Sequence, residues 1–178
     1  MRPMMAMLCL LAAVALGCGR MVTLKYEPTN PWKGYGTVTV LPFRYEAAER
    51  NRVRPREVET NRASRSDLFL SQEISSFFTG ALQRELVHSG YTLEESSPVT
   101  ISGAIKRFYV DWGSAADRSF ELHAVYSVQA GDQTVFEWTC SSAQQGPNTL
   151  PQDGILIRMG TADCMRRFIQ AAQEAKVL

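Results

Sequence analysis

Segments of helical and strand periodicity follow one another along the chain, and their order predicts an α+β fold. Apolar residues recur every three or four positions over about 67–89 and 153–176, which is typical of amphipathic helices. Alternating apolar and polar residues predict strands at 37–43, 99–112, 120–128 and 134–142. A β-bulge or a strong bend is expected at Lys106-Arg107, where the alternation changes phase. The order strand-helix-strand-strand-strand-helix favours a mainly antiparallel sheet of about four strands with both helices packed on one face.

The first predicted helix has recognisable ends and one unusual residue. Ser66 or Ser71 can cap its start, and Gly90 lies where a left-handed residue commonly ends a helix. Its apolar stripe consists of Leu70, Ile74, Phe77, Phe78, Ala81, Leu82 and Leu86. Glu85 lies near the middle of this stripe, and we interpret it as exposed on the last turn.

The last hairpin has two possible registers. A two-residue turn at Gly131-Asp132 would send Trp138 to the outer face of the sheet. A three-residue loop would instead place Phe136, Trp138 and Cys140 on the core face. We favour the three-residue loop because it buries two aromatic rings.

Two segments lack a periodic apolar pattern. Prolines and glycines interrupt residues 20–35, so we interpret residues 18–35 as a tether. Residues 44–66 contain seven arginines and four glutamates with few large apolar residues, which predicts a long, mobile surface loop. The folded part is then a single α+β domain over residues 36–178.

The N-terminus has the parts of a secretory signal. Arg2 precedes 13 apolar residues, Met4 to Leu16, which are fewer than the roughly 20 needed to span a bilayer. Ala15-Leu16-Gly17-Cys18 resembles the bacterial lipobox, whose cysteine thiol receives diacylglycerol before cleavage. The resemblance implies that residues 1–17 form a signal peptide and that Cys18 becomes the first residue, carrying fatty-acyl chains such as palmitate.

The residue after Cys18 bears on which membrane the protein is sorted to. In the enteric sorting rule an Asp at this position retains lipoproteins in the inner membrane, whereas this chain has Gly19. The resemblance therefore implies the periplasmic face of the outer membrane rather than the inner membrane. We expect Trp32 and Tyr35 to pack across the sheet edge, with a membrane interface as the alternative.

The charge balance limits the classes of binding partner, and the cysteine content allows one disulfide. Without residues 1–17 the chain has 18 basic and 18 acidic residues, so bulk electrostatics predicts no nucleic-acid partner. Only Cys140 and Cys164 then remain with free thiols, in a compartment where disulfides persist. A bond between them requires Cα atoms about 4.4–6.8 Å apart. Two buried free cysteines are the alternative.

Several short patterns together resemble a known family. They are Gln72, Phe78-x₃-Leu82-x₃-Leu86-x₃-Gly90-Tyr91, Pro98-Val99 and Phe108-Tyr109-Val110-Asp111. These residues are similar to the YajG-like family of uncharacterised bacterial lipoproteins over about Leu70–Ala172. The resemblance implies a fold and an envelope address, but no mechanism. The layout is also similar to small lipoproteins that assist envelope transport or lipopolysaccharide assembly.

The sequence offers little for catalysis. His88 and His123 have no partners at metal-ligand spacing, and the chain contains no G-x-S-x-G, S-x-x-K or glycine-rich phosphate loop. We therefore expect no enzymatic activity, no metal and no cofactor.

The strongest candidate for a partner surface is the alternation of Arg50, Arg52, Arg54 and Arg56. In an extended chain these side chains would point the same way and could bind phosphates or carboxylates. The alternative is a solvated loop that is partly neutralised by its own glutamates.

These observations favour a membrane-anchored, non-enzymatic periplasmic lipoprotein that binds another envelope component, with an envelope protein as the expected partner, as an accessory or assembly factor. The alternative is a lipid- or glycolipid-binding module for envelope lipid transport, using a hydrophobic groove between the helices and the sheet, with lipid or lipopolysaccharide as its ligand.

Overall fold

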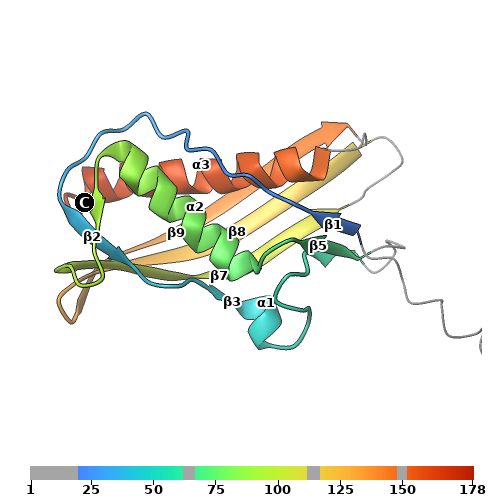
Figure 1. Cartoon of the computed structure of the whole chain (residues 1–178), viewed down its shortest axis with the longest axis horizontal. Helices are drawn as coiled ribbons and strands as arrows, with labels where there is room; N and C mark the ends of the chain where they lie inside the picture. The colour runs from blue at the N-terminus through green and yellow to red at the C-terminus, as the bar shows by residue number, and fades with distance from the viewer. Residues whose placement is uncertain (1–19, 62–66, 112–116, 148–151) are drawn as a thin grey trace, which may run out of the picture.

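A mixed β-sheet with two long helices across one face forms the body of the molecule (Figure 1). The structure is a computed structural model that describes residues 20–61, 67–111, 117–147 and 152–178. The elements are β1 (Arg20–Val22), β2 (Thr37–Val40), β3 (Arg44–Tyr45), α1 (Glu46–Glu49), β4 (Glu59–Thr60), β5 (Leu68–Leu70), α2 (Ile74–Ser89), β6 (Thr92–Leu93), β7 (Val99–Asp111), β8 (Asp117–Ala130), β9 (Gln133–Pro147) and α3 (Gln152–Glu174). The fold belongs to the α+β class, as the periodicity predicts.

Three long antiparallel strands, β7, β8 and β9, make up most of the sheet. Along β7 the pairing steps over Lys106, so that Ile105 lies opposite Ala124 and Arg107 lies opposite His123. This confirms the predicted bulge. The extra residue restores the inward phase, and Ile105 and Phe108 are both fully buried.

Short parallel strands extend the sheet beyond β7. In the described residues seven strands form one sheet in the order β6-β2-β7-β8-β9, with β3 and β4 also paired to β7. The strands β3, β4 and β6 have two residues each, too few to show a period of two, so the expected four-stranded sheet was too small. A separate two-stranded sheet pairs β1 with β5.

Both long helices cover the same face of the sheet, because the side chain of Tyr126 on β8 contacts both of them. Its ring stacks on Phe168 of α3 at 4.3 Å between centroids and lies 6.0 Å from Phe78 of α2. All three side chains are fully buried. Fully burying a large apolar side chain stabilises a fold by about 1.5–3 kcal/mol, so this contact contributes strongly to the core.

The last hairpin buries the side of β9 that was expected to face the core, but its turn differs from the prediction. The turn has two residues, because Ala130 pairs with Gln133 across Gly131-Asp132, and the three-residue loop was wrong. A bulge at Val135 then places Val128 opposite Phe136. The bulge returns the later residues of β9 to the predicted register. Trp138 packs against the core, and Cys140 is fully buried.

The start of the first long helix also differs from the prediction. Residues Leu68–Leu70 form strand β5, and α2 begins only at Ile74, with no side-chain cap on its N-terminus. Ser71 instead donates its backbone N–H to the carbonyl of Val22, while Ser66 lies outside the described residues. The C-terminal prediction is confirmed, because Gly90 ends the helix with a left-handed φ of 102°.

The segment expected to be a tether is packed against the domain over residues 20–35. Strand β1 pairs with β5, and the chain then runs past α3 and around the C-terminal end of α2 toward β2 (Figure 1). Leu24, Tyr26 and Asn30 are all buried. The tether interpretation was therefore wrong for these residues. Its prolines limit regular hydrogen bonding, but they do not prevent packing.

Residues 44–61 are also ordered, in contrast to the predicted mobile loop. Strands β3 and β4 pair with β7, and α1 lies between them in the sequence. Tyr45, Ala47 and Val58 are buried, so a few well-placed apolar residues suffice to attach this charged segment. Residues 62–66 lie outside the described part of the chain.

No helix in the described ranges is both long and apolar enough to cross a membrane.

Candidate functional site

The four arginines that the sequence singles out lie around a turn rather than along an extended strand. Arg50 follows α1, and Asn51 has a left-handed φ of 54°. Three of the arginines lie beside glutamates: Arg50 with Glu46 at 2.7 Å, Arg52 with Glu59 at 4.0 Å and Arg54 with Glu57 at 4.0 Å. Arg56 is exposed. The geometry assumed for an anion-binding strip was therefore wrong, and the alternative of mutual neutralisation describes the segment better.

Glu46 is the centre of this charged segment. Its carboxylate also accepts a hydrogen bond from the ammonium group of Lys106, the residue that the β7 bulge sets apart from the pairing. This hydrogen bond, together with the charges of Lys106 and Arg50, lowers the pKa of the Glu46 carboxyl below its ordinary value. The ion pairs thus attach α1 to the sheet.

Glu85 on α2 is fully buried, and the prediction that it is exposed was wrong. Its carboxylate accepts three close hydrogen bonds: from the Tyr26 hydroxyl at 2.5 Å and from the backbone N–H groups of Thr29 and Asn30 at 2.9 Å each. Burial, and next the hydrogen bond to Glu85, raise the pKa of Tyr26 well above its ordinary value. The sequence did show an acidic residue within an apolar stripe. It did not show that the residue is buried, because its hydrogen-bond donors lie more than fifty residues away in the sequence.

The same hydrogen-bond network continues along residues 26–34, which we call the strap. The Asn30 side-chain amide donates to the Ser89 hydroxyl at 2.6 Å, and that hydroxyl donates to the Glu85 carbonyl at 2.7 Å. The Gly34 N–H donates to the Ser89 carbonyl at 2.8 Å. The strap is therefore attached to the C-terminal half of α2 at several points.

The structure joins Cys140 of β9 to Cys164 of α3 by a disulfide, with Cα atoms 5.6 Å apart. Both cysteines are fully buried. Arg167, one turn further along α3, donates to the Ser141 carbonyl at 2.8 Å. The bond and this contact hold the outermost long strand of the sheet against the helix.

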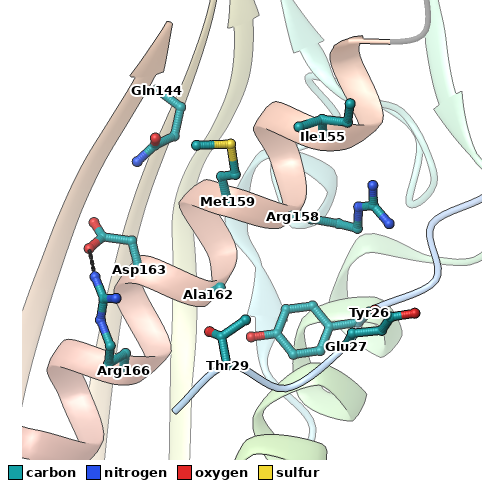
Figure 2. A pocket seen from close by; sticks show the side chains of 10 residues that line it. All are labelled: Tyr26, Glu27, Thr29, Gln144, Ile155, Arg158, Met159, Ala162, Asp163 and Arg166. Carbon is teal, nitrogen blue, oxygen red and sulfur yellow. Dashed lines mark hydrogen bonds and ion pairs between the residues drawn. The ribbon is translucent and has the colours of Figure 1, made fainter. Parts of the chain in front are cut away.

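A cavity of about 500 Å³ lies between the strap and the outer face of α3 (Figure 2). It is lined by Tyr26, Glu27, Thr29, Gln144, Ile155, Arg158, Met159, Ala162, Asp163 and Arg166. Several of its polar groups already have protein partners. Arg158 donates to the carbonyl of Lys25 at 3.3 Å, and Asp163 accepts from Arg166 at 3.2 Å. The cavity is therefore lined by polar as well as apolar side chains, and these two charged side chains already have protein partners.

The space between the helices and the sheet is filled. Phe43, Phe78, Tyr126 and Phe168 occupy it and are at most 2 % exposed. The prediction of a lipid-binding groove between the helices and the sheet was therefore wrong.

The two histidines do not assemble a site in the described residues. His88 and His123 are both exposed, on α2 and β8 respectively. Within the same ranges no three His, Cys, Asp or Glu side chains lie together as metal ligands would. Cys18 and the lipobox lie outside the described residues.

No family model and no curated protein matches the chain, so the resemblance to the YajG-like family stays a prediction. Solved structures do match. A Xanthomonas campestris protein, XCC0632, assigned to the family model DUF330, has a TM-score of 0.69 at 9 % identity, covering 88 % of this chain and 96 % of that one. PelC, a dodecamer from Paraburkholderia phytofirmans, has a TM-score of 0.45 at 10 % identity, covering 78 % and 92 %. A minor lipoprotein from Acinetobacter baumannii has a TM-score of 0.44 at 10 % identity, covering 79 % and 92 %. At these identities the likeness to the Xanthomonas protein shows a shared fold.

Proposed function

We propose that this protein is a bacterial envelope lipoprotein, lipidated at Cys18 and held at the periplasmic face of the outer membrane. There it binds another envelope component as a non-enzymatic accessory or assembly factor. The observation that carries the proposal is the run Ala15-Leu16-Gly17-Cys18 at the end of an apolar segment too short to span a bilayer.

The position of β1 in the sequence supports a particular arrangement at the membrane. Strand β1 begins at Arg20, so Gly19 alone separates the lipidated cysteine from the folded domain. A lipid at Cys18 then holds the β1 end of the molecule close to the bilayer. The ends of β2 and α3 that lie at the opposite end of the molecule face the periplasm (Figure 1).

The described surface supports binding rather than catalysis. The charged side chains around α1 and along α3 are engaged with one another, and the interior is closed by aromatic packing. A partner is therefore bound on the outside of the domain. This favours a protein partner over a lipid enclosed within the fold.

In-cell crosslinking followed by affinity purification of the full chain tests the binding role. We expect a protein to be recovered in stoichiometric amount with the crosslinked chain. Stoichiometric co-purification of a lipid or glycolipid without a protein would contradict the accessory role and favour a lipid carrier.

A further inference from the structure

A second cavity is lined by residues of β2 and of the C-terminal end of α3. These parts of the chain lie at the end of the molecule opposite β1 (Figure 1). The volume of the cavity is about 710 Å³. The segment 33–38, the start of β7 and residues 176–178 line it, and we call it the distal cleft.

The backbone on both sides of Tyr35 is held in place at the rim of this cleft. The Gly34 N–H donates to the Ser89 carbonyl at 2.8 Å, and the Gly36 carbonyl accepts from the Thr92 N–H at 2.9 Å. Gly36 has a φ of 111°, which favours glycine, and a Cβ on Gly34 would collide with the ring of Tyr91. The segment is therefore a fixed turn.

Tyr35 extends from this fixed turn into solvent with 91 % of its surface exposed. It lines the cleft rather than the core, so the expectation that it packs across the sheet edge was wrong. An aromatic side chain on a rigid backbone loses little conformational freedom when a partner covers it. Tyrosine is also among the residues that contribute most to protein interfaces.

The charge around the cleft indicates the chemistry of the partner. Of the described residues that line it, the ones with charged side chains are Lys33 and Lys176, and both are basic. The Lys33 ammonium donates to the carbonyl of His88 at 3.2 Å, which holds it at the rim and leaves its other N–H donors for a partner. Pro98, Val99 and Val177 add an apolar surface between the two lysines. Carboxylates on a partner would complement the two ammonium groups while its apolar side chains cover Tyr35.

We propose that the distal cleft binds an acidic segment of a partner protein, with Tyr35 as the aromatic anchor and with Lys33 and Lys176 pairing its carboxylates. This rests on the proposed function, since the lipid at Cys18 turns the cleft away from the bilayer and toward periplasmic proteins.

The test uses the full mature chain, with Cys18→Ser for solubility, and a displayed library of random 12-residue peptides. We expect the enriched peptides to combine Asp or Glu with apolar residues. Tyr35→Ala should weaken their binding about tenfold, as expected for an anchor residue. Lys33→Gln with Lys176→Gln should weaken it severalfold and flatten its salt dependence. Met159→Ala is the matched control, because Met159 is 50 % exposed in the other cavity, and it should change nothing.

Enriched peptides without excess carboxylates, or peptides that bind Tyr35→Ala as tightly as the unsubstituted chain, would overturn the proposal. Binding of phosphatidylglycerol vesicles that depends on Tyr35 would also overturn it, because the occupant would then be a membrane. Thermal unfolding checks that the variants fold. Lipid labelling of Cys18 is scored separately, so failure of the cleft is distinguishable from failure of the lipoprotein assignment.

Discussion

Glu85 shows how one residue can fix the path of a long segment. A buried carboxylate without partners would cost several kcal/mol, but here the Tyr26 hydroxyl and the Thr29 and Asn30 N–H groups satisfy it. These donors all come from the strap. The carboxylate therefore converts a proline-interrupted segment into an ordered part of the domain.

Replacing Glu85 with Gln should destabilise the protein by about 2 kcal/mol, because the amide group would oppose a backbone N–H and leave buried donors unsatisfied. Urea unfolding measures the change. Glu49→Gln is the control, since Glu49 is exposed and lies 3.7 Å from Arg44 in a surface pair. That variant should differ from the unsubstituted chain by less than about 0.5 kcal/mol. Equal losses in the two variants would contradict the role of Glu85.

The Glu46–Lys106 pair predicts a pH dependence. The lowered pKa of Glu46 in the folded state means that its stabilising effect is present above the pKa of the unfolded chain, about 4.3, and is lost as the pH falls through the folded value. The stability difference between the unsubstituted chain and Glu46→Gln should therefore be present at pH 7 and shrink below about pH 4. A difference that stays constant from pH 7 to pH 3 would show that the pair does not act through ionisation.

At the scale of elements, long periodic segments were predictable and short ones were not. The stripe of α3 and the phase change at Lys106 are visible in sequence because each element repeats its pattern several times. The two-residue strands on β7 carry no period, and their formation depends on an edge supplied by distant residues. The bulge at Val135 was missed for a related reason, because turn length and bulge together set the register.

The disulfide belongs to the element scale, since it joins β9 to α3. Closing a loop with a sequence separation of 24 should stabilise the fold by about 3 kcal/mol in the chain-entropy model. Replacing both Cys140 and Cys164 with Ala should lower the free energy of unfolding by roughly this amount. Thiol counting on the denatured Cys18→Ser mature chain should find none without reductant and two with it. Two reactive thiols before reduction would contradict the bond.

For the molecule as a whole, the candidate site was harder to predict than the fold. The sequence drew attention to the arginines, but the structure pairs three of them with glutamates. The distal cleft combines Lys33, Val99 and Lys176 from distant parts of the chain, so no local motif marks it. A tyrosine between two glycines, Gly34-Tyr35-Gly36, was the one local sign of an exposed aromatic residue. Whether such a segment is rigid depends on hydrogen bonds to distant residues, which the sequence does not show.

The two ends of the molecule have different roles in this account. In the proposed arrangement the β1 end is attached to the membrane through Cys18, and the distal cleft faces the periplasm. Figure 1 shows β1 and the C-terminal end of α3 at opposite ends of the molecule. Because the strap is bound to α2, the anchor and the cleft are connected through a folded domain rather than through a flexible linker. The orientation therefore depends first on lipidation.

Metabolic labelling with a fatty-acid analogue, combined with membrane fractionation, tests lipidation most directly. The unsubstituted chain should be labelled and recovered with the outer membrane, and Cys18→Ser should be unlabelled. Cys9→Ser is the matched control, because Cys9 lies in the signal that is removed, and it should behave like the unsubstituted chain. An unlabelled, soluble unsubstituted chain would contradict the account.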